Sequence, residues 1–327
     1  MTSDAIQLGY SVRQAMGPSL ADCHFLGTRL DTAKGHRPGE AESWILRTDG
    51  DLLEPVYVTT SWITGLWRSR SGVLFVCTLH GDVAVNPTPV AGSGDWRVHH
   101  LPFAIHGIWG LSGSYLWVYG VANGEPRLAF FDGRSFSLTE SPGRIHHLHG
   151  LSTDFVYAVG ADGLIARWNG SRFSRVLSPT DTTLSSVHVV SEDEIYACGA
   201  DDRLLEGSVY GWSEVLAAEG SLFSVRKWNG RVWVAGMADG GAAGLYELQR
   251  NALSPIDFQL RPTSLRDNGD ALLVSGSYGL AETRDGATFS TLSLRKFSAV
   301  VHHRRPLWTS EPFEDDPRYV QDVFPLG

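Results

Sequence analysis

The strongest constraint on the fold is a sequence unit that recurs about every forty residues. Each copy ends a β-rich run with a glycine, as in Phe155–Gly160, and these glycines stand at positions 120, 160, 199, 236 and 276, separated by 40, 39, 37 and 40 residues. An earlier copy, Val73–Thr78, places Thr78 in the same column, 42 residues before Gly120. Regular spacing on this scale predicts a repeat architecture, in which each unit buries its faces against its neighbours.

Each unit reads as four short strands joined by tight turns. The strands are exemplified by four segments, Ile105–Gly110, Phe155–Val159, Leu164–Trp168 and Arg172–Leu177. Three dipeptides fill one equivalent turn, Asp132-Gly133, Asn169-Gly170 and Asp285-Gly286; Asn, Asp and Gly adopt positive φ there at little cost. No 12-residue stretch shows convincing helical periodicity. Four strands in about forty residues are typical of a β-propeller blade.

The pattern predicts an all-β chain that folds as a single β-propeller, with seven blades favoured and six or eight as alternatives. First-strand candidates begin near Ile63, Ile105, Ile145, Leu184, Leu222, Pro262 and Phe297. Residues 63–296 then form the regular blades. Residues 1–62 are expected to supply outer strands, at Ser43–Leu46 and Leu52–Val58, to a closing blade completed by residues 297–327 and an acidic tail. Pairing of N- and C-terminal strands would close the ring and remove exposed edges. Cys23–Leu30 is a further strand candidate, which keeps eight blades open.

The unit resembles the repeats of tectonin-type and Asp-box (BNR-like) β-propellers over about Ile63–Leu294. The shared elements are the apolar-Gly strand end, the Asp-Gly or Asn-Gly that follows, and the aromatic residue that closes each unit. Thr283–Phe289 is the nearest copy of an Asp box, but one residue is missing between Asp285 and Gly286, and Phe289 stands where that family has Trp. The resemblance implies a propeller and little chemistry, because propellers host lectins, hydrolases and scaffolds alike.

Stacking the first strands in register predicts which side chains meet near the central channel. Counting the first residue as position zero, position three is aliphatic and belongs to the core. Position two is mostly small, as expected near a crowded axis: Gly65, Gly107, His147, Ser186, Ser224 and Ser264. Position four holds the candidate ligand- or partner-binding residues: Trp67, Trp109, His149, His188, Arg226 and Arg266. Equivalent positions in successive blades form a ring, so these six side chains are expected at one end of the channel.

The position-four ring has two interpretations. Arginine offers a bidentate fork, tryptophan a stacking face and histidine a tunable charge, which together suit an acidic or planar group. Alternatively, these large side chains pack between blades, with arginine capped by carbonyls or by Asp267. The change from Trp to His to Arg around the ring favours one asymmetric site over a repeated sugar pocket.

We expect no catalytic residue, no cofactor and no metal site, and a protein that is not an enzyme. The pairs His99-His100, His146-His147 and His302-His303 are adjacent in strands, so their side chains point to opposite faces. The chain has no nucleophile elbow, P-loop, zinc-protease motif or dinucleotide fingerprint. The three cysteines, Cys23, Cys77 and Cys198, lie far apart without a C-x-x-C motif, which predicts free structural thiols.

The net charge and the N-terminal sequence restrict the kinds of partner and the compartment that we expect. The net charge is −9, from 36 acidic and 27 basic side chains, which discourages binding to nucleic acid. The chain shows no signal-peptide pattern and no long apolar run, so we expect a cytoplasmic protein without membrane contact. We therefore expect a non-enzymatic propeller that recognises a protein partner, with a basic partner favoured by charge. A bacterial toxin-neutralising (immunity) or regulatory scaffold role would fit. The alternatives are a carbohydrate-binding lectin and a divergent propeller hydrolase, and a small acidic ligand or a glycan could bind as well.

Overall fold

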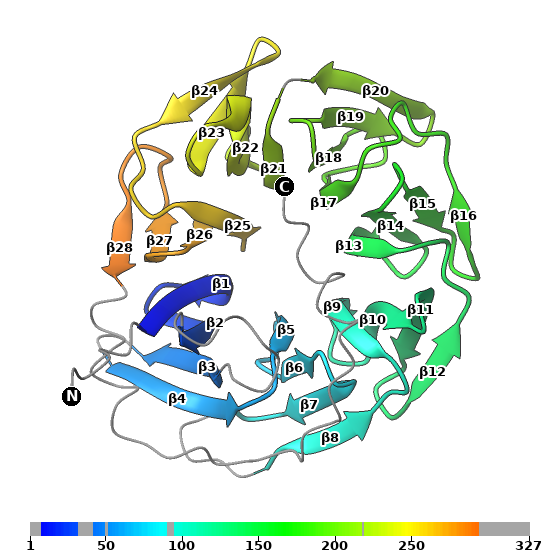
Figure 1. Cartoon of the computed structure of the whole chain (residues 1–327), viewed down its shortest axis with the longest axis vertical. Helices are drawn as coiled ribbons and strands as arrows, with labels where there is room; N and C mark the ends of the chain where they lie inside the picture. Colours follow the sequence, from blue (N-terminus) through cyan, green and yellow to red (C-terminus); the bar gives the residue numbers. More distant parts are fainter. Residues whose placement is uncertain (1–7, 32–41, 50–51, 90–94, 218, 294–327) are drawn as a thin grey trace, which may run out of the picture.

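The strands of the chain form seven four-stranded antiparallel sheets that stand around a central axis as the blades of a propeller (Figure 1). The computed structural model describes residues 8–31, 42–49, 52–89, 95–217 and 219–293. Within each blade, consecutive strands are neighbours, and the first strand lies closest to the axis. The predicted all-β, seven-bladed propeller is therefore confirmed.

The first four blades use strands β1 to β16 in chain order. Blade 1 is β1 (Leu8–Ser19), β2 (Asp22–Asp31), β3 (Glu42–Asp49) and β4 (Leu52–Thr59). Blade 2 is β5 (Ile63–Arg68), β6 (Leu74–Thr78), β7 (Asp82–Asn86) and β8 (Arg97–His100). Blade 3 is β9 (Ala104–Ser112), β10 (Tyr115–Ala122), β11 (Glu125–Phe131) and β12 (Phe136–Thr139). Blade 4 is β13 (Ile145–Ser152), β14 (Phe155–Gly160), β15 (Ile165–Trp168) and β16 (Phe173–Arg175).

The last three blades use strands β17 to β28. Blade 5 is β17 (Leu184–Val189), β18 (Ile195–Gly199), β19 (Leu204–Ser208) and β20 (Gly211–Leu216). Blade 6 is β21 (Ser221–Trp228), β22 (Arg231–Met237), β23 (Gly244–Gln249) and β24 (Ala252–Ile256), with one 3-10 turn, η1 (Ala238–Gly240), after β22. Blade 7 is β25 (Pro262–Asp267), β26 (Leu272–Gly276), β27 (Gly279–Thr283) and β28 (Ser290–Ser293).

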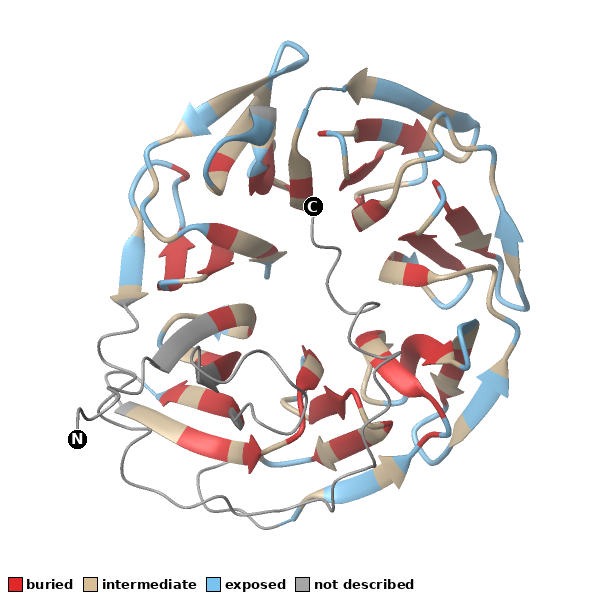
Figure 2. Cartoon of the chain, in the orientation of Figure 1, coloured by how far each residue is buried: buried red, intermediate tan, exposed pale blue. Residues whose placement is uncertain are grey.

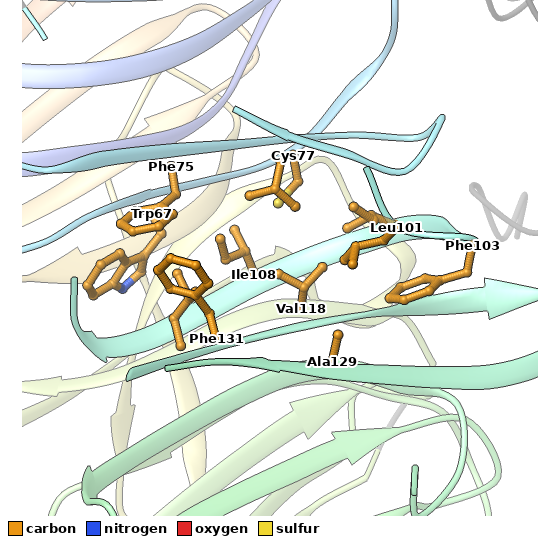
Figure 3. Packing of buried hydrophobic residues seen from close by; sticks show 12 residues of the cluster. Trp67, Phe75, Cys77, Leu101, Phe103, Ile108, Val118, Ala129 and Phe131 are labelled. Carbon is orange, nitrogen blue, oxygen red and sulfur yellow. The ribbon is translucent and has the colours of Figure 1, made fainter. Parts of the chain in front are cut away.

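The core lies between neighbouring blades. The second strands are buried on both faces, as in β14 and β18, whereas outer strands such as β12 are largely exposed (Figure 2). Figure 3 shows the contact of blades 2 and 3, where Phe75 lies 5.8 Å from Phe131 between ring centroids. Since each sheet buries its faces only against its neighbours, the blades stabilise one another and do not fold as independent domains.

Among the described residues, blade 1 consists of four consecutive N-terminal strands, β1 to β4, which pair with one another. The N-terminal segment therefore supplies inner strands as well as the outer strands that were expected from it. The outer strands expected at Ser43–Leu46 and Leu52–Val58 are present as β3 and β4, and Cys23–Leu30 is part of β2, a strand of this blade rather than of an eighth. The strands expected from residue 297 onward lie outside the described residues.

Blades 1 and 7 meet through side-chain packing rather than through strand pairing. Leu280 packs into the apolar cluster of blade 1 that contains Phe25 and Trp44. The backbone N–H of Leu20 donates to Glu282 Oε2 at 2.6 Å, which ties the two blades together.

The equivalent turn predicted in three blades is confirmed between the third and fourth strands. Asp285 is an example: its Oδ1 accepts the N–H groups of Ala287 and Thr288, each at 2.8 Å, and these bonds hold the pKa of the carboxyl below its usual range. Gly286 follows with a φ of 75°, and the corresponding Gly133 and Gly170 have φ of 95° and 94°. Positive φ explains the glycine in each dipeptide.

Candidate functional site

A bulge recurs at one position in the first strand of every blade. The pairing with the second strand skips the residue at position one in each case: Arg13, Thr64, His106, His146, Ser185, Phe223 and Thr263. All seven side chains are half-buried. A bulge changes the direction in which neighbouring side chains point, and in blades 2, 3, 4 and 6 positions one and two both line the central cavity.

These side chains enclose a cavity of about 180 Å³ in the central channel. Position two of all seven blades lines it: Gln14, Gly65, Gly107, His147, Ser186, Ser224 and Ser264. The bulged Thr64, His106, His146 and Phe223 add to the wall, as do Arg226 and Arg266. The channel is therefore polar, with two guanidinium groups and no carboxylate among its described lining residues.

Four position-two side chains also join neighbouring blades. Each accepts a hydrogen bond from the backbone N–H at position three of the next blade: Leu66 to Gln14 Oε1 (3.0 Å), Val187 to His147 Nδ1 (3.2 Å), Val225 to Ser186 Oγ (3.3 Å) and Leu265 to Ser224 Oγ (3.1 Å). We call Gln14, His147, Ser186 and Ser224 the inter-blade acceptors. They satisfy buried N–H groups that have no strand on that side.

Replacing Ser224 with Ala is expected to lower the free energy of unfolding by about 1 kcal/mol, because the buried N–H of Leu265 would lose its acceptor. Urea denaturation measures this change. The matched control is Ser264→Ala at the same position of blade 7, because Ser264 accepts no hydrogen bond from a described residue. Equal losses in the two variants would show that the inter-blade bond contributes nothing of its own.

The six position-four residues differ in how far they are buried and in what they contact. Trp67, Trp109, His188 and Arg226 are buried, with 5%, 4%, 5% and 1% of their surface exposed. Trp67 packs on Phe75 between blades 2 and 3, with ring centroids 5.6 Å apart. Their burial matches the packing interpretation of the ring, and it leaves little of these four side chains for a macromolecule to touch.

Three of the six form a continuous aromatic contact across blades 3 to 5. The ring centroids of Trp109 and His149 are 6.0 Å apart, and those of His149 and His188 are 4.8 Å apart. His149 Nδ1 accepts a hydrogen bond from the backbone N–H of Val189 at 3.1 Å. This inter-blade bond is of the same type as the bond from Val187 to His147 and lies two residues further along both strands. The sequence placed these side chains in one ring, and the structure brings them into contact.

Arg226 and Arg266 are the two position-four residues that reach the cavity. Arg226 Nη1 donates to the carbonyls of Val225 (2.7 Å) and Val187 (3.3 Å), and its Nε lies 3.7 Å from Asp267 Oδ1. Burial, and then the nearby Arg266 charge, lower the pKa of Arg226 to about 10, so it stays charged at neutral pH. Burial likewise lowers the pKa of Arg266.

His147, His149 and His188 are neutral at neutral pH. Burial lowers the pKa values of His147 and His149 well below 6.5, and burial together with the Arg226 charge lowers that of His188 to about 3. The hydrogen bond that His147 Nδ1 accepts from Val187 places the proton of its neutral ring on Nε2. These three rings therefore add no positive charge to that of Arg226 and Arg266.

Sequence reasoning missed the inter-blade acceptors and the bulged residues. The sequence showed that the position-two residues are mostly small, but it did not show that they form hydrogen bonds between blades. Gln14 was missed because β1 was not identified as a first strand. The available signal was a Ser or His at position two of four consecutive first strands: His147, Ser186, Ser224 and Ser264.

A second hollow, of about 450 Å³, lies between blades 3 and 4. Its aromatic wall consists of Tyr115, Trp117, Phe130 and Trp168, and its outer wall includes Ser137, Leu138 and Thr139 of the edge strand β12. Tyr115 and Trp168 both donate to the carbonyl of Thr153, at 2.7 and 2.9 Å. We call this hollow the aromatic groove. These hydrogen bonds hold two of its rings in place, while Leu138 is 59% exposed at its rim.

The described residues bring together no three His, Cys, Asp or Glu side chains that could share a metal ion. In the same part of the chain, no helix has the length and apolar character needed to cross a bilayer. Cys23, Cys77 and Cys198 are free and buried, as predicted. Burial raises the pKa of the Cys23 thiol to about 11 and that of Cys77 further, which makes them poor nucleophiles.

No family model and no curated protein sequence matches the chain. Among solved structures, it is similar to the WD40 β-propeller domain of Doa1, with a TM-score of 0.61 at 13% identity, over 87% of this chain and 97% of that one. It is similar to virginiamycin B lyase from Staphylococcus aureus, with a TM-score of 0.58 at 11% identity, over 83% and 96% of the two chains. A third similar structure is YCF48 bound to D1 peptide, with a TM-score of 0.52 at 14% identity, over 71% and 80%. At these identities the likeness concerns the fold alone: the chain is a seven-bladed β-propeller, a fold similar to that of these solved structures.

Proposed function

We propose that this propeller is a non-enzymatic recognition module whose partner is a protein, and that the partner docks at the aromatic groove. The observation that carries the proposal is the pairing of fixed aromatic rings with the exposed Leu138 on an edge strand. Rigid aromatic pockets of this kind accept an apolar anchor side chain, and an edge strand offers backbone groups to an extended peptide. The similar structures include a WD40 domain and a propeller bound to a peptide, which supports the proposal of a protein partner.

The charge of the chain narrows the partner further. With a net charge of −9, the propeller would attract a basic protein over a long range. Asp154 lies in the wall of the aromatic groove and could pair with a basic residue next to the apolar anchor. The more specific hypothesis of a toxin-neutralising or regulatory scaffold rests on this charge, and the identity of the captured partner would decide it. The resemblance to tectonin-type and Asp-box repeats likewise stays a prediction.

Replacing Leu138 with Asp is expected to abolish capture of a stoichiometric protein partner from native lysate. Docking of the partner would take the new carboxylate out of water at the rim of the aromatic groove, which costs binding free energy. Mass spectrometry of the captured material identifies what is lost. Leu177→Asp is the matched control, because Leu177 is 90% exposed and does not line the groove. The proposal fails if wild type captures no stoichiometric protein, or if Leu138→Asp captures it as well as wild type does.

A carbohydrate ligand is the second candidate, because the rings of Tyr115 and Trp168 in the groove wall could stack on a sugar. A glycan array separates the two candidates. Binding of one glycan class by wild type, lost in the Leu138→Asp variant, would favour the lectin, and an array without a hit would favour the protein partner.

A further inference from the structure

The inter-blade acceptors leave the central cavity lined by hydrogen-bond donors. Gln14 uses its carbonyl oxygen to bind the N–H of Leu66, so its amide NH₂ group remains. His147 uses Nδ1, which leaves the proton on Nε2. Ser186 and Ser224 use an oxygen lone pair each, and their hydroxyl protons have no acceptor among the described residues. The bonds that hold the blades together thus consume acceptors at the channel wall.

Arg266 adds a charge to this ring of donors. Its side chain lines the cavity, and no described residue forms a hydrogen bond or an ion pair with its guanidinium group. Arg226 lies beside it and donates to backbone carbonyls, while Asp267 approaches the Arg226 Nε atom and does not line the cavity. The Arg266 side chain is half-buried at the channel wall, and an anion in the cavity would give its N–H groups a charged acceptor.

We propose that the central cavity binds a small oxyanion, a carboxylate or a phosphoryl group, held by Arg266 and the donor groups of Gln14, His147 and Ser224. Charge-assisted hydrogen bonds from a guanidinium fork are the strongest that a side chain offers to such a group. The volume of about 180 Å³ is smaller than the ~300–1,000 Å³ of sites for drug-sized ligands. A small anion, or one acidic group, therefore fits better than a nucleotide. This site is independent of the aromatic groove and of the partner proposed there.

The test uses the full chain with inorganic phosphate and succinate as probes. Phosphate is added at ionic strength matched with chloride, and both the thermal midpoint and the ³¹P NMR linewidth are recorded. Isothermal titration calorimetry with succinate covers the carboxylate. We expect the probe that binds to raise the thermal midpoint of the protein, because a ligand that binds only the folded state stabilises that state by mass action. Binding of phosphate alone would assign a phosphoryl ligand, and binding of succinate alone a carboxylate.

Two substitutions and one control locate the bound probe. Arg266→Met removes the guanidinium charge, and Gln14→Glu keeps the acceptor for Leu66 while replacing the amide donor with a carboxylate in the channel. Each is expected to weaken binding at least ten-fold. Arg172→Met, at an exposed turn of blade 4, is expected to bind like wild type. If neither probe binds wild type above the chloride control, or if both channel variants bind as wild type does, the proposal is overturned.

Discussion

Replacing Gly160 with Ala is expected to lower the free energy of unfolding by about 3 kcal/mol or more, which is large for a single methyl group. A Cβ atom at this position would lie 1.9 Å from the carbonyl oxygen of Arg144 and 2.9 Å from its carbonyl carbon. Both are backbone atoms, so no side-chain rotation relieves the collision, and strand β14 would have to move away from β13. Urea denaturation followed by tryptophan fluorescence measures the loss.

Gly113→Ala is the control for this prediction. Its nearest neighbour would be a Val73 methyl group at 3.6 Å, an ordinary contact, so a change below ~1 kcal/mol is expected. Gly120 and Gly199 repeat the close approach, at 1.8 Å and 2.0 Å from a backbone oxygen. In blade 2 the equivalent position is Thr78, which does have a side chain. The close approach is therefore a property of the local backbone in the blades that have glycine there. Wild-type stability in Gly160→Ala would show that the blade yields easily.

Acidification from pH 7 to pH 5 is expected to destabilise the folded propeller steeply. Burial depresses the pKa values of His147 and His149 in the folded state, and that of His188 to about 3, whereas in the unfolded chain all three titrate near 6.5. Below pH 6.5 the unfolded state therefore binds more protons than the folded state, and each histidine costs about 1.4 kcal/mol per pH unit. The stability is full above pH 6.5 and is lost as the pH falls toward the folded-state pKa values.

Thermal or urea unfolding at several pH values between 7 and 5 measures this slope. This pH range lies above the range in which carboxyl groups with a lowered pKa titrate, such as that of Asp285, whose ordinary pKa is 3.8. The double variant His147→Asn and His149→Asn keeps a hydrogen-bond acceptor near each Nδ1 position but does not titrate, so we expect a slope lower by two protons. A double variant with the wild-type slope would assign the acid sensitivity to other groups.

The forty-residue period was sufficient to predict the propeller, because a blade is a local unit of consecutive strands and its turns carry their own Asp-Gly or Asn-Gly chemistry. The same register predicted the position-four ring, and the structure does place Trp109, His149 and His188 in contact. Blade 1 escaped detection because β1 lacks the repeat pattern. Arg226 was recognised as a ring member, but only packing shows that carbonyl groups of Val225 and Val187 hold it.

The sequence by itself determined the blade, its repeat number to within one, and the identity of the residues at each register position. Only the tertiary structure decided which atoms of those residues face the channel. The reason is that a recurring bulge re-aims positions one and two, and hydrogen bonds between neighbouring blades then occupy one side of each polar group. Whether Ser224 or His147 presents a donor or an acceptor to the cavity depends on a backbone N–H about forty residues away in the chain, which local sequence cannot specify.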